Sequence, residues 1–273
     1  MKGMRELFIG NGPRITLLTR CALTFGIIAG LASPFLGGQA IALGENDQES
    51  EAAGRKFMNS AIAAMGGPAA FEQVRNISML GMTRVVAGDS ELQGSAQYVY
   101  MRPDKYRVDV NLQPLKVIQA FNGKVGWGME NLNPYPANIN LRIADSMKVV
   151  LTRGLLALFH VNAPGARMRI VAREEIDGIK ADVVEFEDGS ANSTRFYFDA
   201  GTHLPLRAVY ADIDVEGNPV ETTDVFFNFR KVGSLRWPHR MVQYQAGLRK
   251  REDIFTEIQV NGKVTGPYFD PIR

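Results

Sequence analysis

Short runs of alternating apolar and polar residues, separated by turn-forming residues, fill most of this chain and favour a β-rich fold. The clearest example is the segment from Gln97 to Pro134. Tyr106, Val108 and Val110 alternate there with charged residues, which is typical of a strand with one buried and one exposed face. The pair Asn122-Gly123 predicts a tight hairpin, because a type I′ turn needs positive φ at its central residues. We therefore expect consecutive antiparallel strands.

The same pattern continues on both sides of this segment. A hairpin is expected between Arg75 and Tyr100, and a longer series of strands follows Met168. The later strands are predicted at 168–176, 180–187, 194–198, 204–214, 220–230, 240–245 and 250–260. Turn residues separate them about every ten residues, which indicates an antiparallel meander and not alternating strands and helices.

Two segments break the alternation and predict helices. Residues 52–65 place their apolar side chains on one helical face and end at Gly66-Gly67-Pro68. The segment from Ile139 to His160 carries a wider apolar stripe at helical spacing, with a bend expected at Gly154. A stripe of that width predicts a helix buried on much of its circumference. The fold class is therefore mainly β, a curved antiparallel sheet with a helix over its face.

The composition of the chain predicts one folded domain after a short spacer. With 45% hydrophobic and 22% charged residues, it can bury a substantial core. No low-complexity linker follows Met65, so residues 52–273 are predicted to form a single domain, preceded by a flexible spacer at 43–51.

Residues 1–42 are interpreted as a cleaved signal peptide. They hold four basic residues, an apolar run from Cys21 to Leu36, and small residues before a predicted cut after Ala42. A retained transmembrane anchor is the alternative, although Pro34 and two glycines shorten the apolar run. Cys21 is the only cysteine, and the rest of the chain is close to neutral. We expect a periplasmic protein that does not bind nucleic acid.

Patterns typical of enzymes and metal sites are missing from the sequence. The histidines His160, His203 and His239 lack metal-ligand spacing. No nucleophile elbow, phosphate-binding loop or dinucleotide-binding glycine motif occurs. We therefore expect a non-enzymatic protein with no catalytic residue, no metal and no cofactor.

Acidic residues on the later strands leave one enzymatic alternative open. The run that begins at Asp212 is interpreted as part of a hairpin, because a calcium loop would need a glutamate where Thr223 stands. A hydrolase that uses strand carboxylates such as Asp182 and Glu185 is the alternative, and nothing in the sequence favours it.

The chain is instead rich in apolar and aromatic residues on the expected strand faces. A curved antiparallel sheet has a wide inner face that a single helix fills only in part, which leaves an apolar cavity. The candidate cavity residues are Tyr98, Tyr100, Tyr106, Val108, Phe121, Trp127, Met147, Leu151, Leu155 and Phe159. A packed hydrophobic core is the other interpretation of the same residues.

Short turn motifs between residues 102 and 134 carry a family resemblance. They are RPDKYR at 102–107, FNGK at 121–124 followed by Trp127, and Asn133-Pro134. Together they resemble the LolA-like superfamily, the periplasmic outer-membrane lipoprotein-sorting carriers and their relatives. The resemblance implies an unclosed antiparallel β-barrel around lid helices, with 139–160 as the lid over a hydrophobic cavity.

The resemblance also implies a function. It implies a carrier that binds a lipid or a lipidated protein without chemical change and meets delivery partners at the inner or outer membrane. The alternative on the same fold is an envelope sensor or scaffold that binds a protein partner. The carriers' cavity arginine has no clear counterpart here. Arg107 is the nearest by motif, and strand alternation points it away from the face of Tyr106.

Overall fold

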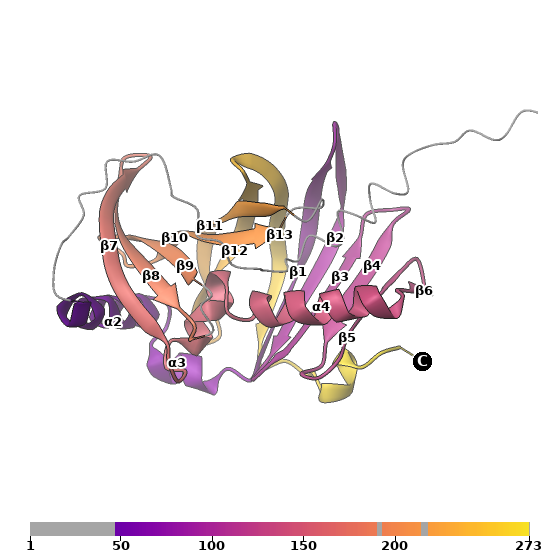
Figure 1. Ribbon diagram of the computed structural model, residues 1–273, viewed down its shortest axis with the longest axis horizontal. Helices are drawn as coiled ribbons and strands as arrows, with labels where there is room; N and C mark the ends of the chain where they lie inside the picture. Colours follow the sequence, from indigo (N-terminus) through magenta and orange to yellow (C-terminus); the bar gives the residue numbers. More distant parts are fainter. Residues whose placement is uncertain (1–46, 190–192, 214–217, 273) are drawn as a thin grey trace, which may run out of the picture.

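A continuous, curved sheet of thirteen antiparallel strands dominates the computed structural model, which describes residues 47–189, 193–213 and 218–272 (Figure 1). The strands are β1 (Asn76–Ala87), β2 (Ser90–Met101), β3 (Lys105–Asn111), β4 (Lys116–Phe121), β5 (Gly126–Glu130), β6 (Asn133–Pro134), β7 (Arg167–Ile176), β8 (Ile179–Glu187), β9 (Ser193–Asp199), β10 (Pro205–Ile213), β11 (Pro219–Val232), β12 (Leu235–Gln245) and β13 (Leu248–Val260). The prediction of a mainly β, antiparallel, unclosed sheet is confirmed.

Two meanders make up the sheet and meet at its centre. The spatial order is β6-β5-β4-β3-β2-β1-β13-β12-β11-β10-β9-β8-β7. One meander runs from β1 outward to β6, and the other runs from β13 outward to β7. The pairing of β1 with β13 joins them and places Ile77 opposite Val260.

Among the described residues, the helices are fewer than the strands. They are α2 (Asp47–Ala64), α3 (Pro68–Gln73), α4 (Ala137–Val150) and two 3₁₀ helices, η1 (Gly154–His160) and η2 (Gly266–Phe269). Within the described ranges, no helix combines the length and apolar character needed to cross a bilayer. The predicted signal peptide at 1–42 and its cut after Ala42 lie outside the described residues.

The start of α2 corrects one prediction. Residues 47–51 were expected to belong to a flexible spacer, yet they form the first turns of the helix. Glu51 forms an ion pair with Arg55 one turn later, at 3.6 Å, an arrangement that supports a helix at this end. The domain boundary proposed at residue 52 therefore falls inside a helix.

The predicted long helix at 139–160 is two separate elements. Helix α4 ends at Val150, and η1 begins at Gly154. Gly154 has a φ of +51°, a left-handed conformation that interrupts an α-helix and that glycine adopts without strain. The expectation of one bent helix is therefore wrong. The break brings Arg153 into an extended conformation, with φ −120°.

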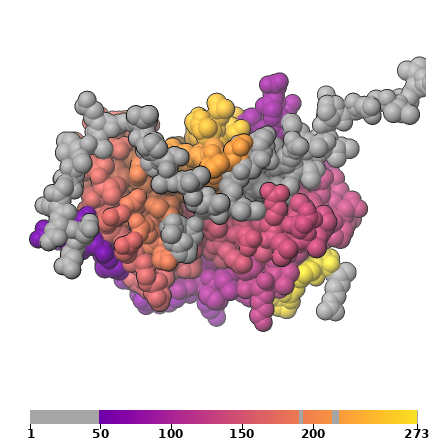
Figure 2. Space-filling model, viewed as in Figure 1, coloured from indigo at the N-terminus to yellow at the C-terminus, as the bar shows by residue number. Residues whose placement is uncertain are grey.

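Helix α4 and η1 cover what we call the inner face of the sheet; the opposite face is the outer face. Figure 1 shows α4 lying across the strands of the first meander, and it packs mainly on β4 and β5. Gly126 permits this approach, because a Cβ there would lie 2.3 Å from the backbone nitrogen of Ala144. In the space-filling view the same helix forms part of the molecular surface (Figure 2).

The hairpin between β4 and β5 exists, but its turn differs from the expected type. Four residues, 122–125, connect the strands, and the side-chain oxygen of Asn122 accepts hydrogen bonds from the backbone nitrogens of Lys124 and Val125. Of the central pair only Gly123 has positive φ, +92°. An asparagine-stabilised loop thus replaces the predicted type I′ turn.

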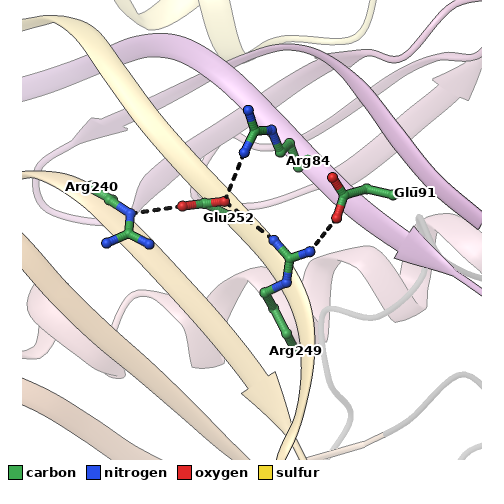
Figure 3. Close-up of polar contacts among 5 residues, drawn as sticks. All are labelled: Arg84, Glu91, Arg240, Arg249 and Glu252. Carbon is green, nitrogen blue, oxygen red and sulfur yellow. Dashed lines mark hydrogen bonds and ion pairs between the residues drawn. The ribbon is translucent and has the colours of Figure 1, made fainter.

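On the outer face, Glu252 of β13 ties the two meanders together (Figure 3). Its carboxylate accepts hydrogen bonds from Arg240 at 2.7 Å, from Arg249 at 3.3 Å and from Arg84 at 3.4 Å. Arg249 also pairs with Glu91 of β2. The cluster therefore links β1, β2, β12 and β13 across the central strand pair.

Candidate ligand-binding site on the inner face of the sheet

Most of the sequence-predicted cavity residues come together in one place. Nine of the ten candidates are buried in one large hydrophobic cluster on the inner face. They are Tyr98, Tyr100, Tyr106, Val108, Phe121, Met147, Leu151, Leu155 and Phe159. Strand alternation supplies the first five from β2, β3 and β4, and the helical segment supplies the others.

Phe159 fixes η1 at the centre of this cluster. Its ring centroid lies 5.1 Å from that of Phe71, 5.5 Å from Tyr100 and 5.9 Å from Trp237. Aromatic pairs at these separations add to the stability gained from burial. Side chains of η1 therefore pack against strands of both meanders.

Trp127 is the exception among the candidates, and its assignment to the cavity is wrong. It packs on the outer face in a separate cluster with Ile118, Ala120 and Met129. Its indole nitrogen donates a hydrogen bond to the carbonyl oxygen of Phe269, at 2.7 Å. Gly126 and Gly128, its neighbours in sequence, are the residues of β5 that face α4.

Arg107 also lies on the outer face, as strand alternation predicts. Its guanidinium stacks over the ring of Tyr268, 4.4 Å from the centroid, and donates a hydrogen bond to the Tyr268 carbonyl oxygen at 2.8 Å. The same guanidinium pairs with Asp109 at 2.9 Å. Arg107 therefore holds the C-terminal η2 against the sheet and does not reach the inner face.

A cavity of about 90 Å³ lies beside η1, on the inner face. Its lining residues are Met79, Tyr106, Val150, Arg153, Gly154, Leu155, Leu156, Tyr210, Asp212, Asp224, Trp237, Met241, Gln243 and Arg251. Only Tyr106 and Leu155 belong to the predicted set. The cavity has an apolar wall, but it is far more polar than the sequence predicts, and buried charged groups occupy its other side.

Asp224 is at the centre of the polar wall. Its carboxylate accepts hydrogen bonds from the hydroxyl of Tyr210 at 2.8 Å and from the amide of Gln243 at 3.0 Å. Burial raises the pKa of Asp224 above its usual range, and the opposing effects of Arg251 and the two hydrogen bonds do not cancel that rise. Asp224 is thus a buried acid that holds its proton more strongly than an exposed aspartate does.

Arg153 and Asp212 form a second buried pair at the cavity. The Nη1 atom of Arg153 lies 3.2 Å from Oδ1 of Asp212, and the two side chains are 6% and 8% exposed. The guanidinium also lies 5.3 Å from the ring centroid of Tyr210. The pair connects the break between α4 and η1 to strand β10.

Arg251 and Asp253 form a third charged group on the same face. The Nε atom of Arg251 lies 3.0 Å from Oδ2 of Asp253, and the hydroxyl of Tyr98 donates to Oδ1 of Asp253 at 3.1 Å. Burial alone would lower the pKa of Arg251, but the neighbouring Tyr98, Asp253 and Asp224 raise it above its usual value. Arg251 therefore stays a cation, with a side chain that is 18% exposed.

Sequence reasoning missed these charged residues. The strand predicted at 204–214 contains Asp212, and β10 confirms that position, but the buried pairing of Asp212 with Arg153 was not expected. Positions 214–217 of the same run lie outside the described residues. One signal was available, since Asp212 and Tyr210 are two positions apart and therefore share a strand face. The pairing of Asp224 with Gln243, and of Gln243 with Arg251, depends on register between strands, which the local pattern does not reveal.

The strand carboxylates of the hydrolase alternative lie elsewhere, in ion pairs. Asp182 pairs with Arg173 at 2.8 Å, and Glu185 pairs with Arg169 at 2.9 Å. Opposite charges on neighbouring strands commonly stabilise a sheet in this way. No group of three or more histidine, cysteine or acidic side chains within the described ranges is arranged to hold a metal ion.

No family model and no curated protein matches this sequence. Solved structures do match. A LolA superfamily protein from Nitrosomonas europaea superposes with a TM-score of 0.51 at 12% identity, over 80% of this chain and 97% of that one. The fold is LolA-like.

Two further solved structures match over similar lengths. A DUF1329 family protein from Desulfovibrio piger has a TM-score of 0.48 at 11% identity, over 81% of this chain and 97% of that one. An outer membrane lipoprotein-sorting protein domain from Vibrio parahaemolyticus has a TM-score of 0.46 at 12% identity, with the same coverage. The open strand order, with β6 and β7 at its two edges, confirms the unclosed sheet implied by the sequence motifs.

Proposed function

We propose that this protein is a non-enzymatic, periplasmic binder or carrier of a hydrophobic ligand, either a lipid or an acylated molecule. The ligand lies on the inner face, between the sheet and the segment formed by α4 and η1. One observation carries the proposal. The inner face of the sheet is a broad apolar surface buried in a single cluster. Over the first meander it is covered by one helix, α4, which contributes few fully buried large side chains.

The energies favour exchange of the helix for a ligand. The buried residues of α4 are Ile143, Ala144, Ser146 and Met147. Exposing Ile143 and Met147 costs about 3–6 kcal/mol, and the partly buried Ile139 and Val150 add to that cost. An acyl chain gains about 0.8 kcal/mol for each methylene that it buries, so ten methylenes contribute roughly 8 kcal/mol. A ligand of ordinary lipid length can therefore displace α4 from the sheet.

The predicted signal peptide supports a periplasmic location, and the fold supports a binding function. The expected signal peptide at 1–42 would export the chain, and the LolA-like fold suits the binding of an apolar ligand inside a curved sheet. Arg153 and Arg251 are held in ion pairs, and Asp224 is held by hydrogen bonds from Tyr210 and Gln243, an arrangement suited to holding a polar group. These features together favour a binding protein over an enzyme.

The direct test is to identify what the protein carries. Protein purified from its native envelope is extracted with organic solvent, the extract is analysed by mass spectrometry, and the emptied protein is titrated with a fluorescent acyl probe. We expect a co-purified lipid and saturable probe binding. Absence of both would exclude the carrier function.

Two variants of α4 locate the ligand. Met147 is fully buried against the sheet, whereas Leu141 on the same helix is 69% exposed. Met147→Asp should abolish probe binding and Leu141→Asp should not. If both variants bind the probe equally well, the ligand does not lie under α4.

A protein-binding role is a second candidate, and an outer-face row favours it. Met82, Ile254 and Phe227 are 40%, 37% and 36% exposed. Ile254 is paired with Met82 on one side and with Arg240 on the other, and Arg240 is paired with Phe227. Crosslinking in the native envelope, with Met82→Glu compared with the exposed-site control Leu132→Glu, tests it. A partner lost only in the Met82 variant supports this role.

A further inference from the structure

Arg153 presents a buried hydrogen-bond donor that the described part of the chain does not use. Its Nη1 atom pairs with Asp212, but its Nη2 atom is buried and has no hydrogen-bond partner. Leaving a buried donor of a charged group unsatisfied is costly, so such a group needs an acceptor. The guanidinium lines the cavity beside η1, where an acceptor atom of a ligand can reach it.

The lining and the volume of the cavity suit the polar end of an amphiphile. One side consists of apolar residues, among them Met79, Trp237 and Met241. The other side is the polar row formed by Asp224, Gln243 and Arg251, which are opposite one another on three neighbouring strands. A volume of about 90 Å³ holds a polar head of a few heavy atoms; a water molecule occupies about 30 Å³ in the liquid.

The charges at the cavity limit which head groups fit. Arg153 is balanced by Asp212, and Arg251 is balanced by Asp253. The carboxyl of Asp224 adds a third acid beside the cavity. A bound anion would lie close to Asp224, and a bound cation would lie close to Arg153. Both are disfavoured by like-charge repulsion in a buried site.

We propose that this cavity binds the uncharged polar end of an acylated ligand, a glyceride ester or hydroxyl group whose oxygen accepts a hydrogen bond from Nη2 of Arg153. This inference rests on the proposed function and deepens it, since it names the ligand class. The acyl chain then extends over the inner face toward α4. Two sources share this chemistry, a free neutral glyceride and the glyceride group of a lipid-modified protein.

Competition binding tests the head-group preference. A pyrene-labelled acylglycerol is bound to the full-length protein at pH 7.5 and displaced by 1-oleoylglycerol, oleate or oleylamine, which share one chain length. We expect 1-oleoylglycerol to compete at concentrations about tenfold lower than either charged lipid, the difference expected for one hydrogen bond from a charged donor. Equal or better competition by oleate or oleylamine would overturn the inference and leave the carrier function standing.

Variants link the preference to the cavity. The double variant Arg153→Met/Asp212→Leu removes the donor and the carboxylate together, so no single buried charge is left behind. It should bind 1-oleoylglycerol about tenfold more weakly. Asp224→Asn should improve competition by oleate about fivefold, because the like charge is gone. Arg84→Met, on the outer face, is the matched control and should change neither value.

Two further results of these binding experiments would overturn the inference, and a lipid-modified peptide identifies the source of the ligand. If the pyrene probe does not bind at all, both the proposed function and this inference fail. If the double variant and Asp224→Asn fold and keep the wild-type preference, the cavity is not the head-group site. A diacylglyceryl-modified peptide is added as a further competitor. Displacement by the peptide in place of the free glyceride, or the reverse, supports the inference and identifies the source of the ligand.

Discussion

Nη1 of Arg153 lies 3.2 Å from Oδ1 of Asp212, and this buried ion pair fastens the break between α4 and η1 to strand β10. Removing one member of a buried pair leaves the other charge poorly compensated, which commonly costs 3–5 kcal/mol. Replacing both members by apolar residues avoids that cost. We therefore expect single and double variants of this pair to differ in their free energies of unfolding.

Arg153→Met alone should lower the free energy of unfolding by about 3 kcal/mol, whereas Arg153→Met/Asp212→Leu should lower it by less than the single change. Urea unfolding followed by circular dichroism measures all of these values in one double-mutant cycle. If the losses of the two single variants simply add in the double variant, the two side chains are not coupled.

The pKa of Asp224 predicts how stability depends on pH. Burial raises the pKa of this carboxyl in the folded state, so the folded protein holds more protons than the unfolded chain just above the ordinary value of 3.8. The contribution of Asp224 to stability is therefore greatest at low pH and declines as pH rises through the folded-state pKa.

Asp224→Asn should remove this decline. Relative to the wild type, the variant should gain stability between pH 4 and pH 8, as measured by urea unfolding at each pH. Asparagine keeps an oxygen that can accept the hydrogen bond of Tyr210. A difference between wild type and variant that stays constant over this range would show that the pKa of Asp224 is not raised.

Glu252 should have the opposite pH dependence. A hydrogen bond from Arg240 is the main cause that lowers its pKa, and Arg84 and Arg249 add to it. A lowered folded-state pKa gives stability that is present above the unfolded pKa and is lost as pH falls through the folded value. Glu252→Gln should cost about 1 kcal/mol at neutral pH and low salt, and less in 1 M salt, because the arginines are partly exposed. An unfolding free energy that is equally reduced at every pH and salt concentration would contradict this account.

Gly126 controls how closely α4 approaches the sheet. A Cβ at this position would lie 2.3 Å from the backbone nitrogen of Ala144, so Gly126→Ala must displace the helix. We expect a loss of about 1–3 kcal/mol in stability and faster hydrogen exchange of the α4 amides. Gly266→Ala, where the added Cβ meets nothing within 4 Å, is the matched control. Unchanged exchange in α4 would mean that the helix is not held by this contact.

Local patterns predicted the strands well. The strand expected at 168–176 is β7, Arg167–Ile176, and the strand expected at 250–260 is β13, Leu248–Val260. The start of β12 was missed, because the strand was expected at 240–245 whereas β12 begins at Leu235 and contains Pro238. Pro238 is paired with Phe229 of β11, but the pairing of β12 with β13 begins only at Arg240, so β12 has a free side at this proline.

The face of Trp127 could have been predicted. Any hairpin loop with an even number of residues pairs Phe121 with an even-numbered residue, so Trp127 must share a face with Ala120. The glycines on both sides of Trp127 concealed the alternation, because they have no side chain to show which face is buried. The buried charges were a different problem. Which of them face one another depends on the register of β10 to β13 and on the position of η1, and no local pattern contains either.

The pairing of β1 with β13 also has a consequence for how the molecule folds. Each meander joins strands that are neighbours along the chain, so each can form from local hairpins. The central pair instead brings together the beginning and the end of the strand-forming region, and closing so long a loop has a large entropic cost. We expect this seam to form last and to limit the folding rate, which leaves two half-sheets as the intermediates that a chaperone would encounter.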